Sequence, residues 1–268
     1  MKLLYIFLAT VLSINAVAQF SNLNNEFSWE SVEKLLSDEE KLDILSKINE
    51  SLFYYLEDNH LLREKLGNFH FFDLNNDDLL DFVYVGYSGA EQPATLVFTQ
   101  NEKGYYKKIL EASGVVYDIT NITLVSAFYQ LKIVNNDGCY DCLGVKNLST
   151  YFYNGGDFER AELISFTKET VMPSIEFKKQ FKIINQKYYL RSSPEINNEG
   201  DKPDVLFGNV IAQYQSDVKG YALAHKEDHT GRTWWFVAIE ANKSTRALFQ
   251  QKEGYYVGWM SSRFLEEI

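Results

Sequence analysis

The spacing of apolar residues divides the chain into a helical start and a β-rich remainder. The tetrapeptide Ser37-Asp38-Glu39-Glu40 fits a capping box, in which the Ser37 and Glu40 side chains satisfy free amides at a helix start. The spacing within residues 28–66 is helical, and the pattern predicts a helix that covers a sheet. One apolar stripe is formed by Leu42, Leu45, Ile48, Leu52 and Leu56.

From Asn68 the period of the pattern falls to two, which is typical of strands. Aromatic residues make up 15% of the chain and strengthen this preference, because aromatic and β-branched side chains favour sheet. Residues 168–186 are mixed in character, and a further run of short strands begins at Tyr188. In the first part, strands are predicted over residues 81–87, 95–100, 105–111, 122–134 and 149–154.

The first eighteen residues have the pattern of a secretory signal peptide. Lys2 supplies a positive start, an apolar run follows, and Ala16-Val17-Ala18 is a small-x-small cleavage site. The apolar run is too short to span a bilayer. We therefore expect cleavage near Ala18, a mature chain that begins at Gln19, and export to the periplasm or the medium.

The net charge of −11 at pH 7 limits the partners that the protein can have. Loss of Lys2 with the leader makes the mature chain one unit more negative. A field of this sign repels nucleic-acid phosphates and anionic lipid head groups, and it attracts cations. We therefore expect no nucleic-acid binding and no membrane insertion.

An acidic loop lies between two apolar runs in the stretch FFDLNNDDLLDFVYVG, residues 71–86. Ca²⁺ takes about six to eight oxygen ligands, and carboxylates crowded together without a cation repel one another. The loop is not an EF-hand, because Tyr84 stands where the bidentate Glu would be and a strand follows. We expect a calcium site, with a solvated Asx-turn loop as the alternative. Oxygen-bearing groups recur at alternate positions: Asp73, Asn75, Asp77, the carbonyl of Leu79, and Asp81.

These residues resemble the Ca²⁺ loop and following strand of FG-GAP or VCBS-type repeats, which build the blades of integrin-α-like β-propellers. Asp78 departs from the pattern, because the family has Gly at this sharp turn, although Asp tolerates a left-handed backbone better than most residues. The resemblance implies a Ca²⁺ ligand set of Asp73, Asn75, Asp77 and Asp81 through their side chains and Leu79 through its carbonyl.

A thinner copy of the loop, IVNNDGCYDCLGV, follows about sixty residues later. Asn135, Asp137 and Asp141 repeat three of the oxygen positions, but Ile133 replaces the first ligand, so we expect a metal-free turn. Two repeats cannot close a propeller. We therefore expect an abbreviated, open arrangement of two blade-like sheets.

Both cysteines of the chain, Cys139 and Cys142, lie in this second copy. In an exported chain a disulfide is the expected state. The alternatives are a redox pair, a metal site and free thiols. The negative charges of the flanking Asp137 and Asp141 disfavour the thiolate that a redox pair would need.

The C-terminal part resembles a bacterial SH3-like (SH3b) domain over about eighty residues, from its opening LRSSP at residues 190–194 to its closing GWMSSRFL at residues 258–265. The resemblance implies a small barrel that binds a peptide, a cell-wall fragment or a protein segment through an aromatic groove. In the central strand TWWFV, alternation sends the two tryptophans to opposite faces, one of them covered by a neighbour or offered to a ligand. Arg191 is expected to be solvated. The candidate ligand contacts are Trp234, Trp235, Tyr255 and Trp259.

The sequence offers little support for catalysis. The stretch GYSGA at residues 86–90 nearly matches the serine-hydrolase elbow, but it ends in Ala and Pro93 argues against the required helix. His225 directly precedes KEDHTGR and His229 lies within it, in a predicted hairpin loop where solvation is expected. No spacing singles out a carboxylate pair.

The sequence thus predicts a mainly β, exported, non-enzymatic binding protein, with a structural calcium loop and an SH3b module. The alternatives are an accessory or regulatory subunit of a cell-wall hydrolase, a weak hydrolase, and a purely structural surface protein. The predicted parts are a signal peptide at 1–18, a helical cap at 19–67, two FG-GAP-like repeats at 68–170, a linker at 171–187 and the SH3b-like domain at 188–268.

Overall fold

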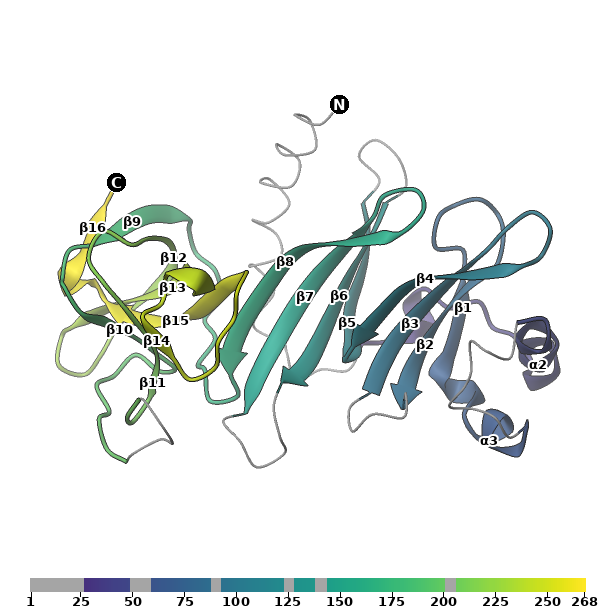
Figure 1. Cartoon of the computed structure of the whole chain (residues 1–268), viewed down its shortest axis with the longest axis horizontal. Helices are drawn as coiled ribbons and strands as arrows, with labels where there is room; N and C mark the ends of the chain where they lie inside the picture. Colours follow the sequence, from purple (N-terminus) through teal and green to yellow (C-terminus); the bar gives the residue numbers. More distant parts are fainter. Residues whose placement is uncertain (1–26, 49–58, 88–92, 123–127, 138–143, 201–205) are drawn as a thin grey trace. The chain divides into compact units, whose positions relative to one another are not determined.

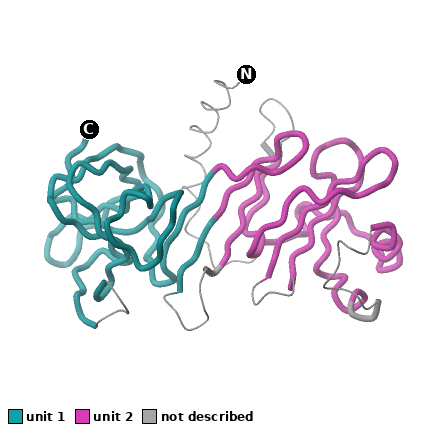
Figure 2. Tube along the Cα trace, viewed as in Figure 1, with its two compact units in different colours: residues 1–23, 136–148, 162–268 teal, residues 24–135, 149–161 magenta. Residues whose placement is uncertain are grey.

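The computed structural model describes residues 27–48, 59–87, 93–122, 128–137, 144–200 and 206–268, and it shows a mainly β protein (Figure 1). The chain divides into two compact units (Figure 2). The described residues of unit 1 fall within 136–148 and 162–268, and those of unit 2 fall within 27–135 and 149–161.

The elements follow one another as in Figure 1. The helical elements are η2 (Trp29–Ser31), α2 (Asp38–Ser46), α3 (Asn59–Glu64), η4 (Leu66–Asn68), η5 (Ala241–Lys243) and η6 (Ser262–Phe264). The first eight strands are β1 (Phe69–Phe72), β2 (Asp81–Tyr87), β3 (Pro93–Gln100), β4 (Tyr106–Ser113), β5 (Val115–Ile122), β6 (Phe128–Asp137), β7 (Val145–Tyr153) and β8 (Phe158–Thr167). The later strands are β9 (Lys179–Ile183), β10 (Tyr188–Arg191), β11 (Val210–Tyr214), β12 (Lys219–Glu227), β13 (Thr233–Glu240), β14 (Arg246–Ala247), β15 (Tyr255–Ser261) and β16 (Leu265–Glu267).

Strands β1 to β4 form a four-stranded antiparallel sheet in chain order, and both of its faces are covered. On one face, Phe71 and Phe98 pack with Leu45 from α2. On the other face, Val83 and Val97 pack with residues of β5 and β6. All four residues of β1 are buried, because a sheet covered on both faces requires nearly continuous apolar runs.

A second run of four strands follows, hydrogen-bonded in the order β5-β6-β7-β8. Gly114 alone separates β4 from β5. It has φ 112°, and a Cβ here would collide with the backbone carbonyl of Val134, so the turn requires glycine. The sequence predicted one strand over 122–134, whereas β5 ends at Ile122 and β6 begins at Phe128.

Helix α2 begins at the predicted capping box, which is confirmed. The Ser37 hydroxyl accepts from the Glu40 amide (3.3 Å), and the Ser37 amide donates to the Glu40 carboxylate (2.8 Å). The helix ends at Ser46, and the last two residues of the predicted stripe, Leu52 and Leu56, lie outside the described residues. None of the described helices is long and apolar enough to cross a membrane.

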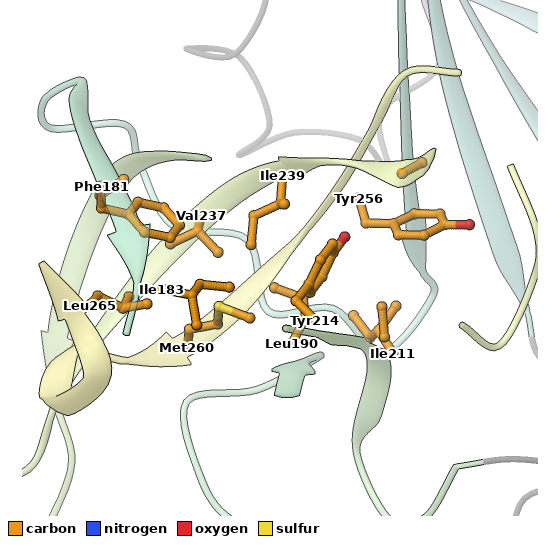
Figure 3. Close-up of a cluster of buried hydrophobic side chains, with 13 residues drawn as sticks. Phe181, Ile183, Leu190, Ile211, Tyr214, Val237, Ile239, Tyr256, Met260 and Leu265 are labelled. Carbon is orange, nitrogen blue, oxygen red and sulfur yellow. The ribbon is translucent and has the colours of Figure 1, made fainter. Parts of the chain in front are cut away.

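The C-terminal strands of unit 1 surround an apolar core (Figure 3), in which Phe181, Tyr214, Tyr256 and Met260 are fully buried. The strand order is β16-β9-β12-β13-β15, and β15 also pairs with β10, which continues to β11 and β14. No pairing among the described strands joins β14 to β16. The sheet is therefore open, where the sequence predicted a small barrel.

The predicted linker at residues 171–187 contains strand β9, which the sequence analysis missed. Phe181 and Ile183 of β9 are fully buried, and the strand lies between β12 and β16. The other residues of β9 are Lys and Gln, so the strand has only two apolar residues. Its partners lie more than thirty residues away in the chain, and local pattern gives no sign of them.

Candidate functional site

The acidic loop joins β1 to β2 in unit 2, and the pair formed by Phe72 and Asp81 closes it. Two of its residues have left-handed backbone, Asn76 with φ 57° and Asp78 with φ 63°. Asn and Asp accept this conformation more readily than other non-glycine residues. Asp78 therefore makes the left-handed turn at the position where the resembling repeats have glycine.

The loop is held by its own polar side chains. The two carboxylate oxygens of Asp73 accept from the amides of Asp77 (3.2 Å) and Asp78 (3.0 Å). The Asn75 side-chain oxygen accepts from the Asp77 amide (3.2 Å), and Asp77 accepts from the Leu79 amide (2.9 Å). The side chains of Asp73, Asn75 and Asp77, all predicted ligands, are therefore brought together around one short stretch of backbone.

Asp81 is fully buried at the base of the loop. Its carboxylate accepts from the amides of Leu74 (3.0 Å) and Gln100 (2.8 Å). Burial raises the pKa of Asp81 to about 7; the two amide hydrogen bonds lower it, and the negative charges of Asp77 and Asp73 raise it further. The buried carboxyl thus sits in a field that disfavours its charge.

The described residues around the loop supply no positive charge that pairs with it. Among the ion pairs of the described residues, none includes Asp73, Asp77, Asp78 or Asp81. Burial, and to a lesser degree the charge of Asp81, raises the pKa of Tyr106 to about 12.

The donor set fits a hard cation chemically. A carboxylate oxygen that accepts one amide hydrogen keeps a lone pair for a metal, and Ca²⁺ prefers carboxylate, amide and carbonyl oxygens. Within the described residues, no three His, Cys, Asp or Glu side chains form a ready-made metal cluster. The ligand set implied by the resemblance also includes the Asn75 side chain and the carbonyl of Leu79, neither of which is a His, Cys, Asp or Glu side chain.

Sequence reasoning missed the support that β3 and β4 give to the loop. Gln100 contacts the loop twice, through its amide to Asp81 and through its side chain to the Leu80 amide (3.4 Å). The Tyr106 hydroxyl donates to the Leu80 carbonyl (3.0 Å). These residues lie about twenty positions beyond the loop, and no local pattern connects them to it.

The second copy of the loop falls mostly outside the described residues. Ile133 and Asn135 lie in β6, and Ile133 is buried in the core between the two sheets. Asp141, Cys139 and Cys142 lie outside the described residues, so the predicted turn and disulfide stay predictions.

Two of the predicted SH3b contacts are interior residues. Trp234 and Trp259 are 2% and 1% exposed, and their indole N–H groups donate to the Asp228 carboxylate (2.9 Å) and to the Val171 carbonyl (2.7 Å). With side chains buried and N–H groups satisfied, neither tryptophan offers a surface to a ligand. The two instead hold the hairpin loop and the segment before β9 in place.

The other two predicted contacts are half-buried and lie apart. Trp235 pairs with Met260, whereas Tyr255 pairs with Glu240, five residues further along the same ladder. At the rise of a strand this is a separation of about 17 Å. The four predicted contacts therefore do not form one aromatic groove.

Arg191 was expected to be solvated, and the structure corrects this: it is 6% exposed. Its guanidinium donates to the Asn197 carbonyl (3.0 Å) and to the side-chain oxygens of Asn209 (2.7 Å) and Asn198 (3.0 Å). The arginine thereby ties the long β10–β11 connection to the sheet. Gly258 supports this arrangement, because a Cβ there would come within 2.5 Å of the Arg191 carbonyl oxygen.

The histidines expected to be solvated lie at the surface. His225 is half exposed at the end of β12 and contacts Glu176 (2.8 Å), and His229 is exposed in the β12–β13 hairpin loop.

Comparison with known proteins gives no family assignment: no family model, no curated protein and no solved structure matches the chain.

Proposed function

We propose that the protein is an exported, non-enzymatic binding protein. In this proposal Ca²⁺ stabilises the acidic loop, and the C-terminal SH3b-like module recognises a peptide, a peptidoglycan fragment or a protein partner. The observation that carries the proposal is the acidic loop itself. Its carboxylates converge on one stretch of backbone beside buried Asp81, without a cationic partner among the described ion pairs.

Electrostatics supports calcium as a structural ion. Burial and the neighbouring carboxylates oppose the charge of Asp81, and a bound cation would offset both effects. Asp73, Asn75, Asp77, Asp81 and the Leu79 carbonyl would hold the ion. Its contribution would be to tie β1 to β2, and no reaction is assigned to it.

The strand arrangement supports two blade-like repeats at residues 68–170. The first sheet is a four-stranded antiparallel run in chain order, and β5 to β8 follow as a second run of four. These strands begin at Phe69 and end at Thr167. The α2 region covers the outer face of the first sheet, where a closed propeller would place another blade.

The C-terminal arrangement supports a binding module at residues 188–268. Strands β10 to β16 share one core, and the closing Gly-Trp pair has a structural reason, since Gly258 admits the Arg191 backbone and Trp259 is buried beside Phe236. A small sheet domain with a complete core and half-exposed aromatic residues suits recognition better than catalysis.

The calcium proposal is tested by melting the full chain in EDTA and in millimolar Ca²⁺. Ca²⁺ should raise the melting temperature, because a ligand that binds only the folded state stabilises it by mass action. Asp77→Asn keeps an oxygen that accepts from the Leu79 amide but removes a charge. The variant should match or exceed the wild type in EDTA, where repulsion is relieved, and should lose the Ca²⁺ response.

Asp157→Asn, in the exposed turn between β7 and β8, is the matched control and should keep the full Ca²⁺ response. A wild-type melting temperature that is the same in both buffers would contradict the calcium proposal. The binding role is tested separately by cosedimentation with insoluble peptidoglycan and by fluorescence anisotropy with labelled neutral and acidic peptides, and absence of binding to all three would contradict it.

A further inference from the structure

Two arginines lie at the same end of the ladder formed by β13 and β15 in unit 1. Arg232 directly precedes β13, and Arg263 lies in η6, directly after β15. The Ser262 hydroxyl donates to the Thr233 carbonyl (3.1 Å) and fixes η6 against the start of β13. Like charges at the same end of paired strands repel one another, so this placement costs stability unless an anion joins them.

Aromatic rings lie against both guanidinium groups. The Cζ atom of Arg263 is 5.4 Å from the ring centroid of Phe264, and that of Arg232 is 5.9 Å from the ring of Trp234. Tyr188 packs edge-on against Phe264 (5.5 Å). An arginine stacked on a ring still presents its N–H edge, which is the part that binds carboxylates.

The charges of three arginines influence the pKa of the same phenol, that of Tyr188. Burial raises the pKa of Tyr188, whereas its hydrogen bond to Ser261 and the charges of Arg232, Arg191 and Arg263 lower it. None of the ion pairs among the described residues includes any of these arginines. A chain with net charge −11 therefore carries a local positive surface.

Two neighbouring charged groups, Arg191 and Asp228, modify this surface in opposite directions. Arg191 is buried and donates to neutral oxygens, so its charge is added to the field. The Asp228 carboxylate, on the adjacent hairpin, accepts from the Thr230 hydroxyl (2.6 Å), the Trp234 indole (2.9 Å) and the Arg232 amide (3.1 Å). These hydrogen bonds lower its pKa, so Asp228 stays charged and offsets one of the three arginines, while its oxygens are held by the hairpin itself. Arg232 is half-buried and Arg263 is exposed, so the N–H groups of both are within reach of a ligand.

We propose that Arg232 and Arg263, with Tyr188 and Phe264 beside them, bind the carboxylate groups of an acidic peptide segment. This rests on the proposed binding function of the C-terminal module and names the chemistry of its partner. A peptide fits better than a long polyanion, because the overall negative charge of the protein repels a polyanion over its whole length. Two arginines beside aromatic rings match a carboxylate that is followed by an apolar side chain.

The test is a fluorescence-anisotropy titration of the full chain with a labelled peptide, acetyl-Glu-Glu-Phe-Glu-amide, and with its Gln-for-Glu analogue. The acidic peptide should bind more tightly than the neutral analogue, and moderate salt should weaken its binding. Arg232→Gln and Arg263→Gln should each raise the Kd roughly tenfold, since each removes one charge-assisted contact. Arg246→Gln, at an exposed position on β14, should leave the Kd unchanged.

Three results with the peptides and variants, and a fourth with polyphosphate, would overturn the inference. The first is equal Kd values for the acidic and neutral peptides, which would leave peptide binding by the module intact. The second is an equal loss of affinity in Arg246→Gln and Arg263→Gln. The third is no binding of the acidic peptide, in which case the peptidoglycan and neutral-peptide assays still decide the proposed function. Tighter binding of sodium polyphosphate than of the peptide would contradict the assignment to a peptide.

Discussion

Asp81 in unit 2 and Arg191 in unit 1 are both buried charged residues at the start or end of a strand, yet their surroundings are opposite in kind. Arg191 donates to three neutral oxygens, all from the connection that follows its own strand. Asp81 accepts from two amides, but Asp73 and Asp77 add charge of its own sign. Arg191 has its hydrogen-bond partners supplied by the fold alone, whereas Asp81 has no positive charge to pair with among the described ion pairs.

The difference separates two uses of a buried charge. A buried charge is stable when hydrogen-bond partners replace its hydration, as they do for Arg191. Such a residue fixes a loop and needs no further ligand. A buried carboxylate beside other carboxylates has hydrogen bonds but an unfavourable field, and a cation is the simplest way to correct that field. The contrast therefore supports the proposal that a cation binds at the acidic loop and not near Arg191.

The largest effect is expected from Arg191→Leu. The substitution removes three hydrogen bonds and leaves the side-chain oxygen of buried Asn209 without its donor, so the free energy of unfolding should fall by about 3 kcal/mol. Urea denaturation measures this loss. Arg246→Leu, at an exposed position, should change the free energy of unfolding by less than about 0.5 kcal/mol. Equal effects of the two substitutions would show that Arg191 does not organise the connection.

The second-largest effect is expected from Asp81, and the pH dependence of the free energy of unfolding in EDTA measures it. Its folded pKa of about 7 lies above its ordinary value, so the folded state holds the proton more tightly than the unfolded chain. Its contribution to stability is therefore complete below about pH 4 and is lost as the pH rises through about 7. Ca²⁺ should abolish this loss by stabilising the carboxylate. Asp81→Asn should remove the pH dependence in EDTA, whereas Asp157→Asn should retain it.

The smallest effect is expected from His70, a buried group that remains neutral. Trp29 stacks on its ring (3.7 Å), and Glu33 contacts its Nδ1 atom (3.2 Å). Burial lowers the pKa of His70, while the hydrogen bond and charge of Glu33 raise it and the charge of Lys41 lowers it. The contribution of neutral His70 to the free energy of unfolding is therefore present above about pH 6.5 and is lost as the pH falls below that value.

Melts in Ca²⁺ isolate the His70 effect, because the opposing Asp81 effect is then suppressed. His70→Gln should flatten the fall in melting temperature on the acid side, and His229→Gln, in the exposed hairpin loop, should leave it unchanged. The same acid-side fall in both variants would assign it to other groups.

Local features of the sequence predicted local features of the structure. The capping box at Ser37 and the bounds of β2 are confirmed, and Asp78 adopts the left-handed turn that its position requires. Each of these depends on residues within about four positions of one another. The convergence of Asp73, Asn75 and Asp77 is equally local, and the loop therefore follows the predicted spacing.

Features that depend on distant contacts were missed. Strand β9 looked like a linker, because its partners β12 and β16 lie far along the chain. Arg191 looked solvated, because the oxygens that bury it come from Asn197, Asn198 and Asn209 in a long connection without a regular pattern. Trp234 and Trp259 looked like ligand contacts, because their coverage by Asp228 and Val171 is visible only in three dimensions.

The most direct test of the calcium account is isothermal titration of Ca²⁺ into the metal-free full chain. We expect one bound Ca²⁺ per chain, because the second copy of the loop lacks its first ligand. Asp77→Asn should abolish the binding heat, and Asp157→Asn should preserve it. Absence of a binding heat in the wild type at millimolar Ca²⁺, or unchanged binding in Asp77→Asn, would contradict the account.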